Sequence, residues 1–125
     1  MMRFAPYLLF LSSIILPVFA DENAKDGDLE KKINWLIDRI EKSNLTFIRN
    51  DVEYNSKDAV AHLRKKYAHV KDKVHSIEDF VNYVASQSYT TGKPYLLKNE
   101  KGEVVKAKDW LLSVFKKEYA GAEVK

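Results

Sequence analysis

Apolar residues return every three or four positions in four separate segments of the chain, with polar residues between them. This is the period of the α-helix, and it predicts four helices that each turn one face to a core. The apolar positions are Leu29, Ile33, Leu36, Ile37 and Ile40, then Ala59, Val60, Leu63, Tyr67, Val70 and Val74, then Ile77, Phe80, Val81 and Val84, and last Trp110, Leu111, Val114, Phe115 and Tyr119.

Capping residues mark the starts of these helices. Asp28 can accept hydrogen bonds from the free amides of the first turn, and the second helix is expected after Asn55 or Ser56. Ser76 followed by Asp79 resembles a capping box and predicts the start of the third helix. The last helix is expected to begin near Asp109.

Two short β-hairpins are predicted between the helices. In the first, Phe47–Ile48 and Val52–Tyr54 flank the turn dipeptide Asn50-Asp51, whose residues both tolerate positive φ. In the second, Tyr95–Leu97 and Val104–Val105 flank a turn at residues 99–102. The chain is therefore expected to form one small α+β domain over residues 28–119, in the order α-ββ-α-α-ββ-α. The repeated helix-hairpin-helix order is compatible with a duplication or with chance similarity of two hairpins.

The N-terminus predicts export. Arg3 precedes an uncharged apolar run, and Val18 and Ala20 place small residues before a cleavage point at Asp21, the pattern of a signal peptide over residues 1–20. We expect a periplasmic or secreted protein with no membrane-spanning segment after cleavage behind Ala20; the alternative is a retained anchor. Residues 21–27 are expected to form a flexible leader and residues 120–125 a frayed end.

Composition excludes several classes of function. The chain has no cysteine, so disulfides, thiol chemistry and cysteine zinc sites are absent. A net charge of +3, with acids interspersed among the lysines, argues against nucleic acid as a partner. His62, His69 and His75 lack the spacing of a metal site, and no cofactor motif is present, so neither a metal nor a cofactor is expected.

Several strings along the chain form a distinctive set: 47–50 with Tyr54, 61–63 with 66–67, 79–81, 84–86 and 91–95, and Trp110-Leu111. Their order and spacing resemble a family of small exported proteobacterial proteins, catalogued as domain of unknown function 5329, over residues 29–119. The resemblance implies one small domain behind a signal peptide and supplies no reaction. It also implies Gly at position 51 and often Cys at position 45, where this chain has Asp51 and Leu45.

Candidate ligand-binding residues fall in two groups. Arg49 could hold a carboxylate or phosphate with its planar fork, or it could pair with Glu53 across the hairpin. His62, beside the core stripe and one turn before Lys66, could transfer a proton or could bond a neighbouring group. The full candidate set is Arg49, Tyr54, His62, Ser86, Ser88, Thr91, Lys93 and Tyr95.

The segment from Ser86 to Tyr95 is rich in hydroxyls and could cradle an anion or a sugar, or could simply be a helix end closed by Gly92. Because no catalytic set is complete, these features favour a non-enzymatic binding or accessory module of the cell envelope. Its partner would be an anionic envelope component or a protein.

Two alternative functions remain open. One is a small hydrolase or transferase, with His62 as base and a Ser or Thr of residues 86–91 as nucleophile. The other is a structural module that docks through its hairpin edges. The basic helix over residues 57–73 could meet anionic lipid or glycan, or could be a solvated face.

Overall fold

The computed structural model describes residues 27–119. The predicted signal peptide, the predicted frayed end and all of the predicted leader except Gly27 lie outside these residues. The chain divides into two units, residues 1–31 and residues 32–125. In the first unit the described residues, 27–31, are helical, and they are the start of helix α1 at residues 27–41. The four strands and the helices that follow α1 all lie within the second unit.

The second and third helices begin where their capping residues predict, whereas the last helix begins at Ala107, two residues before Asp109, and has no side-chain cap. Helix α2 (Ser56–Val70) has Asn55 as its N-cap, and the Asn55 side chain accepts a hydrogen bond from the Asp58 amide. Ser76 caps α3 (Ile77–Val84) by accepting from the Asp79 amide at 3.0 Å. The Asp79 carboxylate accepts in return from the amide of His75, which extends the capping box by one residue. A short 3-10 turn, η1 (Lys71–Lys73), follows α2, and a π turn, η2 (Phe115–Tyr119), follows α4 (Ala107–Val114).

The two predicted hairpins join into one antiparallel sheet. Strands β1 (Thr46–Arg49) and β2 (Val52–Tyr54) form the first hairpin, and β3 (Leu96–Lys98) and β4 (Val104–Lys106) form the second. Because β1 also pairs with β3, the order across the sheet is β2-β1-β3-β4. The α+β class and the predicted order of elements are confirmed, whereas the pairing of the two hairpins was not predicted.

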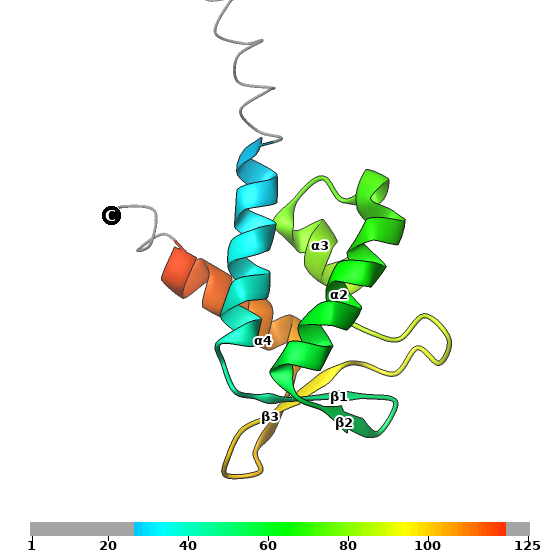
Figure 1. Cartoon of the computed structure of the whole chain (residues 1–125), viewed down its shortest axis with the longest axis vertical. Coiled ribbons are helices and arrows are strands. Elements are labelled where there is room, and N and C mark those ends of the chain that lie inside the picture. Colours follow the sequence, from blue (N-terminus) through cyan, green and yellow to red (C-terminus); the bar gives the residue numbers. More distant parts are fainter. Residues whose placement is uncertain (1–26, 120–125) are drawn as a thin grey trace, which may run out of the picture. The chain divides into compact units, whose positions relative to one another are not determined.

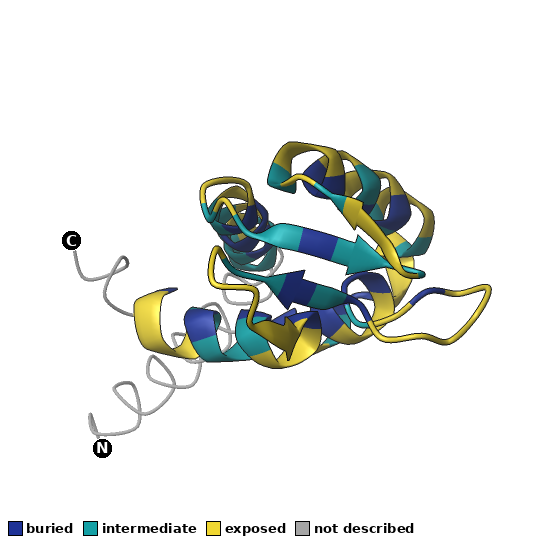
Figure 2. Ribbon diagram, turned by 90° about the horizontal axis from the view of Figure 1, so that it is seen from below, coloured by how far each residue is buried: buried dark blue, intermediate teal, exposed yellow. Residues whose placement is uncertain are grey.

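The helices lie on one side of the sheet, above it in Figure 1. Side chains on successive strand residues alternate between the two faces, so Phe47 and Leu97, which are register partners, point together into the core. Figure 2, viewed from below, shows teal with a dark blue stretch on each central strand, β1 and β3, and mainly yellow on the edge strands β2 and β4. No helix within residues 27–119 is long and apolar enough to span a bilayer.

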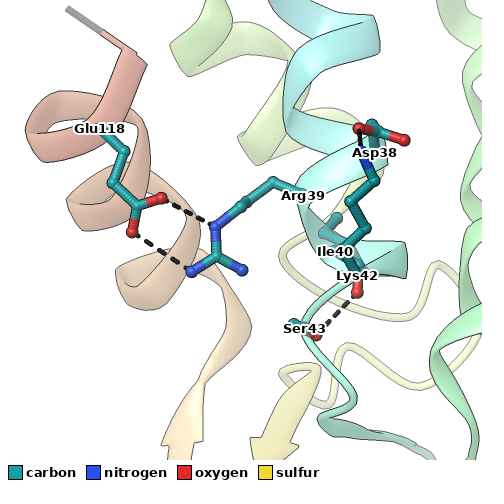
Figure 3. Close-up of polar contacts among 6 residues, drawn as sticks. All are labelled: Asp38, Arg39, Ile40, Lys42, Ser43 and Glu118. Carbon is teal, nitrogen blue, oxygen red and sulfur yellow. Dashed lines mark hydrogen bonds and ion pairs between the residues drawn. The ribbon is translucent and has the colours of Figure 1, made fainter. Parts of the chain in front are cut away.

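Helix α1 is held to the C-terminal turn η2. Arg39 donates two hydrogen bonds to Glu118, of 2.8 Å and 3.3 Å, as Figure 3 shows, and its guanidinium lies over the Trp110 ring. Trp35 meets Phe115 and Tyr119 edge-on. These contacts place residues near both ends of the described chain in one cluster.

One interpretation of the loop between α3 and β3 is wrong. Helix α3 ends at Val84, so Gly92 does not close it. Gly92 instead lies in a turn within the loop, with a φ of 74°, and its amide donates a hydrogen bond to the Ser88 carbonyl. The loop of residues 85–95 therefore folds back on itself, with an isolated bridge between Gln87 and Pro94.

Candidate functional site

Lys66, on α2, is buried with only 7% of its surface exposed. Its ammonium donates to the Gln87 carbonyl at 2.7 Å and to the Tyr95 hydroxyl at 2.9 Å. The same nitrogen lies 3.9 Å from the centre of the Tyr89 ring and 4.7 Å from that of Tyr95. The 85–95 loop thus encloses a lysine with a carbonyl, a hydroxyl and two aromatic faces, which are weaker partners for a cation than a carboxylate.

A pocket of about 300 Å³ opens beside this lysine. We call it the basic pocket; its lining residues are Arg49, His62, Lys65, Lys66, His69, Ser88, Tyr89, Thr90 and Tyr95. Among these described residues there is no Asp or Glu. Arg49 extends from the end of β1 on the same face as Phe47, and its Nε is buried without a hydrogen-bond partner among residues 27–119. The pocket therefore collects positive charge and unused hydrogen-bond donors, the composition that binds an anion.

A second pocket of about 180 Å³ adjoins the first. We call it the hairpin pocket, since it lies between the β1–β2 hairpin and the start of α2. Its lining residues are Phe47, Arg49, Tyr54, Asp58, Ala59 and His62. Arg49 and His62 line both pockets and so form the boundary between them.

Burial and like charge lower the pKa values of the basic groups. Burial, followed by the charge of Arg49, lowers the pKa of Lys66 to about 8. Burial also lowers the pKa of His62, and the charges of Arg49, Lys66 and Lys65 lower it further. Burial raises the pKa of Tyr95, an effect that the neighbouring Arg49 guanidinium opposes. An anion in the basic pocket would favour the protonated forms of Lys66 and His62.

Tyr95 connects Lys66 with His62. The phenol oxygen accepts from the Lys66 ammonium and lies 3.4 Å from His62 Nε2. Because the phenol keeps one proton, it can donate that proton to an unprotonated Nε2, which favours the histidine tautomer with its hydrogen on Nδ1. Lys66, Tyr95 and His62 thus form one continuous polar chain along the wall of the basic pocket.

The structure places five of the eight candidate residues around the two pockets: Arg49, Tyr54, His62, Ser88 and Tyr95. The other three lie elsewhere. Ser86 donates to the Asn82 carbonyl at the end of α3. Thr91 donates to the Asn50 side chain, and Lys93 pairs with Asp51 at 2.6 Å. Thr91 and Lys93 therefore attach the 85–95 loop to the β1–β2 turn and do not line either pocket.

Two contacts that the sequence left open, an Arg49–Glu53 ion pair and a hydrogen bond between His62 and a Ser or Thr hydroxyl of the loop, are not found among the described residues. Glu53 pairs with Lys98 on the outer face of the sheet, so Arg49 has no ion pair with it. The hydroxyl of Ser88 lies within hydrogen-bond distance of the side chains of Asn50 and Thr90, and within the described residues no hydrogen bond joins His62 to a Ser or Thr of the loop. The described residues therefore do not show the pair of His62 with a Ser or Thr hydroxyl on which the hydrolase alternative depends. Residues 27–119 also contain no cluster of three or more His, Asp or Glu side chains that could hold a metal.

Sequence reasoning missed the central residue of the site. Lys66 belongs to the basic segment over residues 57–73, for which both interpretations, a lipid- or glycan-binding surface and a solvated face, require exposed lysines, yet Lys66 is buried. A signal was present, because Asp58, His62, Lys65, Lys66 and His69 follow the i, i+4, i+7, i+8, i+11 spacing of one helix face. Nothing local indicates that a loop twenty residues later covers this face, and the roles of Tyr89 and Thr90 follow from that covering.

The fold and the site define the class of this protein: a small α+β domain with a basic, aromatic-walled pocket. The chain belongs to the family of unknown function DUF5329, whose model matches residues 28–118. It is similar to the uncharacterized protein YfeK of Salmonella typhimurium, with 39% identity over 83 residues, which cover 66% of this chain and 67% of that protein. No solved structure matches. The predicted family membership is confirmed.

Proposed function

We propose that this protein is an exported, non-enzymatic binding module of the bacterial envelope that captures a small anionic ligand in the basic pocket. The observation that supports this proposal is the environment of Lys66. A buried ammonium without a carboxylate beside it is costly, because its lost hydration is only partly replaced. An anion placed against Lys66 and the free Nε of Arg49 would supply the missing partner.

The hydrogen-bonding groups of the basic pocket support ligand binding rather than catalysis. The rings of Tyr89 and Tyr95 both lie close to the Lys66 ammonium, and the Ser88 hydroxyl already has hydrogen-bond partners in Asn50 and Thr90. The groups that remain free to meet a ligand are therefore cationic donors, not a nucleophile with its base. Such donors bind oxyanions through charge-assisted hydrogen bonds, each worth about 1.5–3 kcal/mol.

The test is calorimetric titration of the purified protein with sulfate and with benzoate, using Lys66→Met against a matched Lys108→Met control. Lys108 is an exposed lysine on α4, so its replacement removes the same charge away from the pocket. We expect Lys66→Met to weaken binding about 10-fold or more, from the loss of one charge-assisted hydrogen bond. Lys108→Met should change it less than about 2-fold, since exposed charges are well screened.

The pH dependence of binding provides a second readout. Since the pKa of Lys66 is about 8, its ammonium is lost as the pH rises from about 7 to about 9, and sulfate affinity should fall over this interval. The Lys66→Met protein should lack that fall. Equal weakening by Lys66→Met and Lys108→Met, with equal pH profiles, would mean that only the net charge attracts anions, and the proposal would fail.

A further inference from the structure

The face of α2 that lines the two pockets carries opposite charges at its two ends. Asp58 lies in the hairpin pocket, and Lys65 and Lys66 lie in the basic pocket. Lys66 is eight positions after Asp58 in the sequence, which corresponds to about 12 Å along a helix at 1.5 Å per residue. His62 and Arg49 lie between these ends because both line the two pockets. The site is therefore dipolar along its length.

The Asp58 carboxylate is available to a ligand. The cap of α2 uses the Asp58 backbone amide, which donates to Asn55 at 2.8 Å, and leaves the side chain exposed. Within residues 27–119 no hydrogen bond or ion pair engages this carboxylate, although the next acidic residues along the chain toward β1, Glu53 and Asp51, are both paired with lysines. An exposed carboxylate that lines a pocket can accept a hydrogen bond from a ligand's ammonium group.

Apart from Arg49 and His62, the wall between the charged ends is apolar or aromatic. Phe47, Ala59 and the ring of Tyr54 line the hairpin pocket beside Asp58. Phe47 packs on Tyr95, with ring centres 5.1 Å apart, so the apolar wall continues to the boundary with the basic pocket. A ligand that follows this wall needs an uncharged middle and charged ends.

We propose that the two pockets together bind a short linear zwitterion, with its carboxylate beside Lys66 and Arg49 and its ammonium beside Asp58. This inference rests on the proposed function, because the carboxylate end occupies the anion site described above. Three peptide residues in extended form span about 10 Å, close to the separation of the charges on α2. A linear ω-amino acid of similar length has the same end groups, so both sources of this chemistry are tested.

The experiment compares ligands that differ at one end. Trialanine, its N-acetyl form, its C-terminal amide and aminooctanoate are titrated separately into the purified protein. N-acetylation should weaken binding about 2- to 5-fold, the size expected for an ion pair with an exposed carboxylate. Amidation of the C-terminus should weaken it about 10-fold or more, because a buried charge-assisted contact is lost.

A matched pair of variants assigns the ammonium contact. Asp58→Asn should abolish the difference between trialanine and its acetyl form. Asp109→Asn, which removes an exposed acid from the equivalent first turn of α4, should leave that difference intact. Both residues are exposed, so neither substitution disturbs the core.

The outcomes separate this inference from the proposed function. Tighter binding of aminooctanoate than of trialanine would support the zwitterion and indicate a non-peptide source. Equal binding of free and acetylated trialanine, or binding of sulfate and benzoate with neither zwitterion, would overturn the inference and leave the anion site standing. Failure of sulfate and benzoate to bind as well would overturn both.

Discussion

Lys66 has an unusual environment for a lysine, because it is buried and no carboxylate lies among the described residues that line its pocket. Lysines are seldom buried without a paired carboxylate, since the ammonium is strongly hydrated in water. Here the compensation comes from Gln87, Tyr89 and Tyr95, all in the 85–95 loop. The energetic consequence is that the folded protein holds the Lys66 proton less firmly than the unfolded chain does.

This difference predicts how the stability of the protein depends on pH. The pKa of Lys66 is about 8 in the folded protein against an ordinary 10.5, so between these values the unfolded chain binds more protons and the free energy of unfolding rises with pH. At 1.36 kcal/mol per pKa unit the full effect is about 3 kcal/mol. We expect urea denaturation of the wild-type protein to show a gain of about 1–3 kcal/mol relative to Lys66→Met between about pH 8 and pH 10.

The comparison with Lys66→Met cancels the titration of groups that do not contact Lys66. Tyr95 does contact it, but its raised pKa acts in the opposite direction only above pH 10, outside the measured interval. Parallel pH profiles of the two proteins would show that Lys66 keeps its ordinary pKa in the fold.

The β1–β2 hairpin has a two-residue turn in which both residues adopt positive φ. Asn50 and Asp51 have φ angles of 50° and 67°, the left-handed conformation of a two-residue hairpin turn. Asn50 also holds the 85–95 loop, because its side chain donates to Ser88 and accepts from Thr91. The two turn residues therefore have different roles: Asn50 positions the loop, and Asp51 bears strain at an exposed position.

Replacing Asp51 with Gly should stabilise the protein. Glycine adopts positive φ without a steric penalty, and the exposed ion pair with Lys93 that is lost contributes little. We expect Asp51→Gly to raise the free energy of unfolding by about 0.5–1 kcal/mol in urea denaturation.

The reverse substitution in the second hairpin is the control. Gly102 has a φ of 83° with open space around its Cβ position, so Gly102→Ala should cost about 1 kcal/mol through backbone strain alone. A destabilised Asp51→Gly protein would mean that the Lys93 ion pair outweighs the strain.

The local elements could be predicted from the sequence and their assembly could not. Asn50-Asp51 and Ser76 carry their own signals, because turn geometry and capping depend on residues close in the chain. The pairing of Phe47 with Leu97 has no such signal, since it joins strands fifty residues apart. The same reason explains the site: Arg49 and His62 were identifiable as candidates, but the enclosure of Lys66 depends on the tertiary position of Tyr89.

For the whole molecule, the export predicted from the sequence would decide where a ligand is met. The signal peptide predicted at residues 1–20 lies outside the described residues, and its cleavage stays a prediction. We expect the protein from a periplasmic or culture fraction to begin at Asp21, which intact-mass spectrometry would detect. Replacing Val18 and Ala20 with bulky residues should leave the precursor uncleaved in the membrane fraction. A cytoplasmic chain that retains Met1 would contradict this expectation.

The central pairing of β1 with β3 also governs how the protein folds. Each hairpin closes over a few residues and can form within microseconds, whereas the contact between them must close a loop of about fifty residues before any of its hydrogen bonds form. Joining the hairpins is therefore expected to be the slow, rate-limiting step. Until β3 (Leu96–Lys98) pairs with β1, one backbone edge of β1 is unpaired and could pair with another chain. A chain shortened before Leu96 would keep that edge permanently, and we expect it to aggregate rather than to remain as a smaller folded protein.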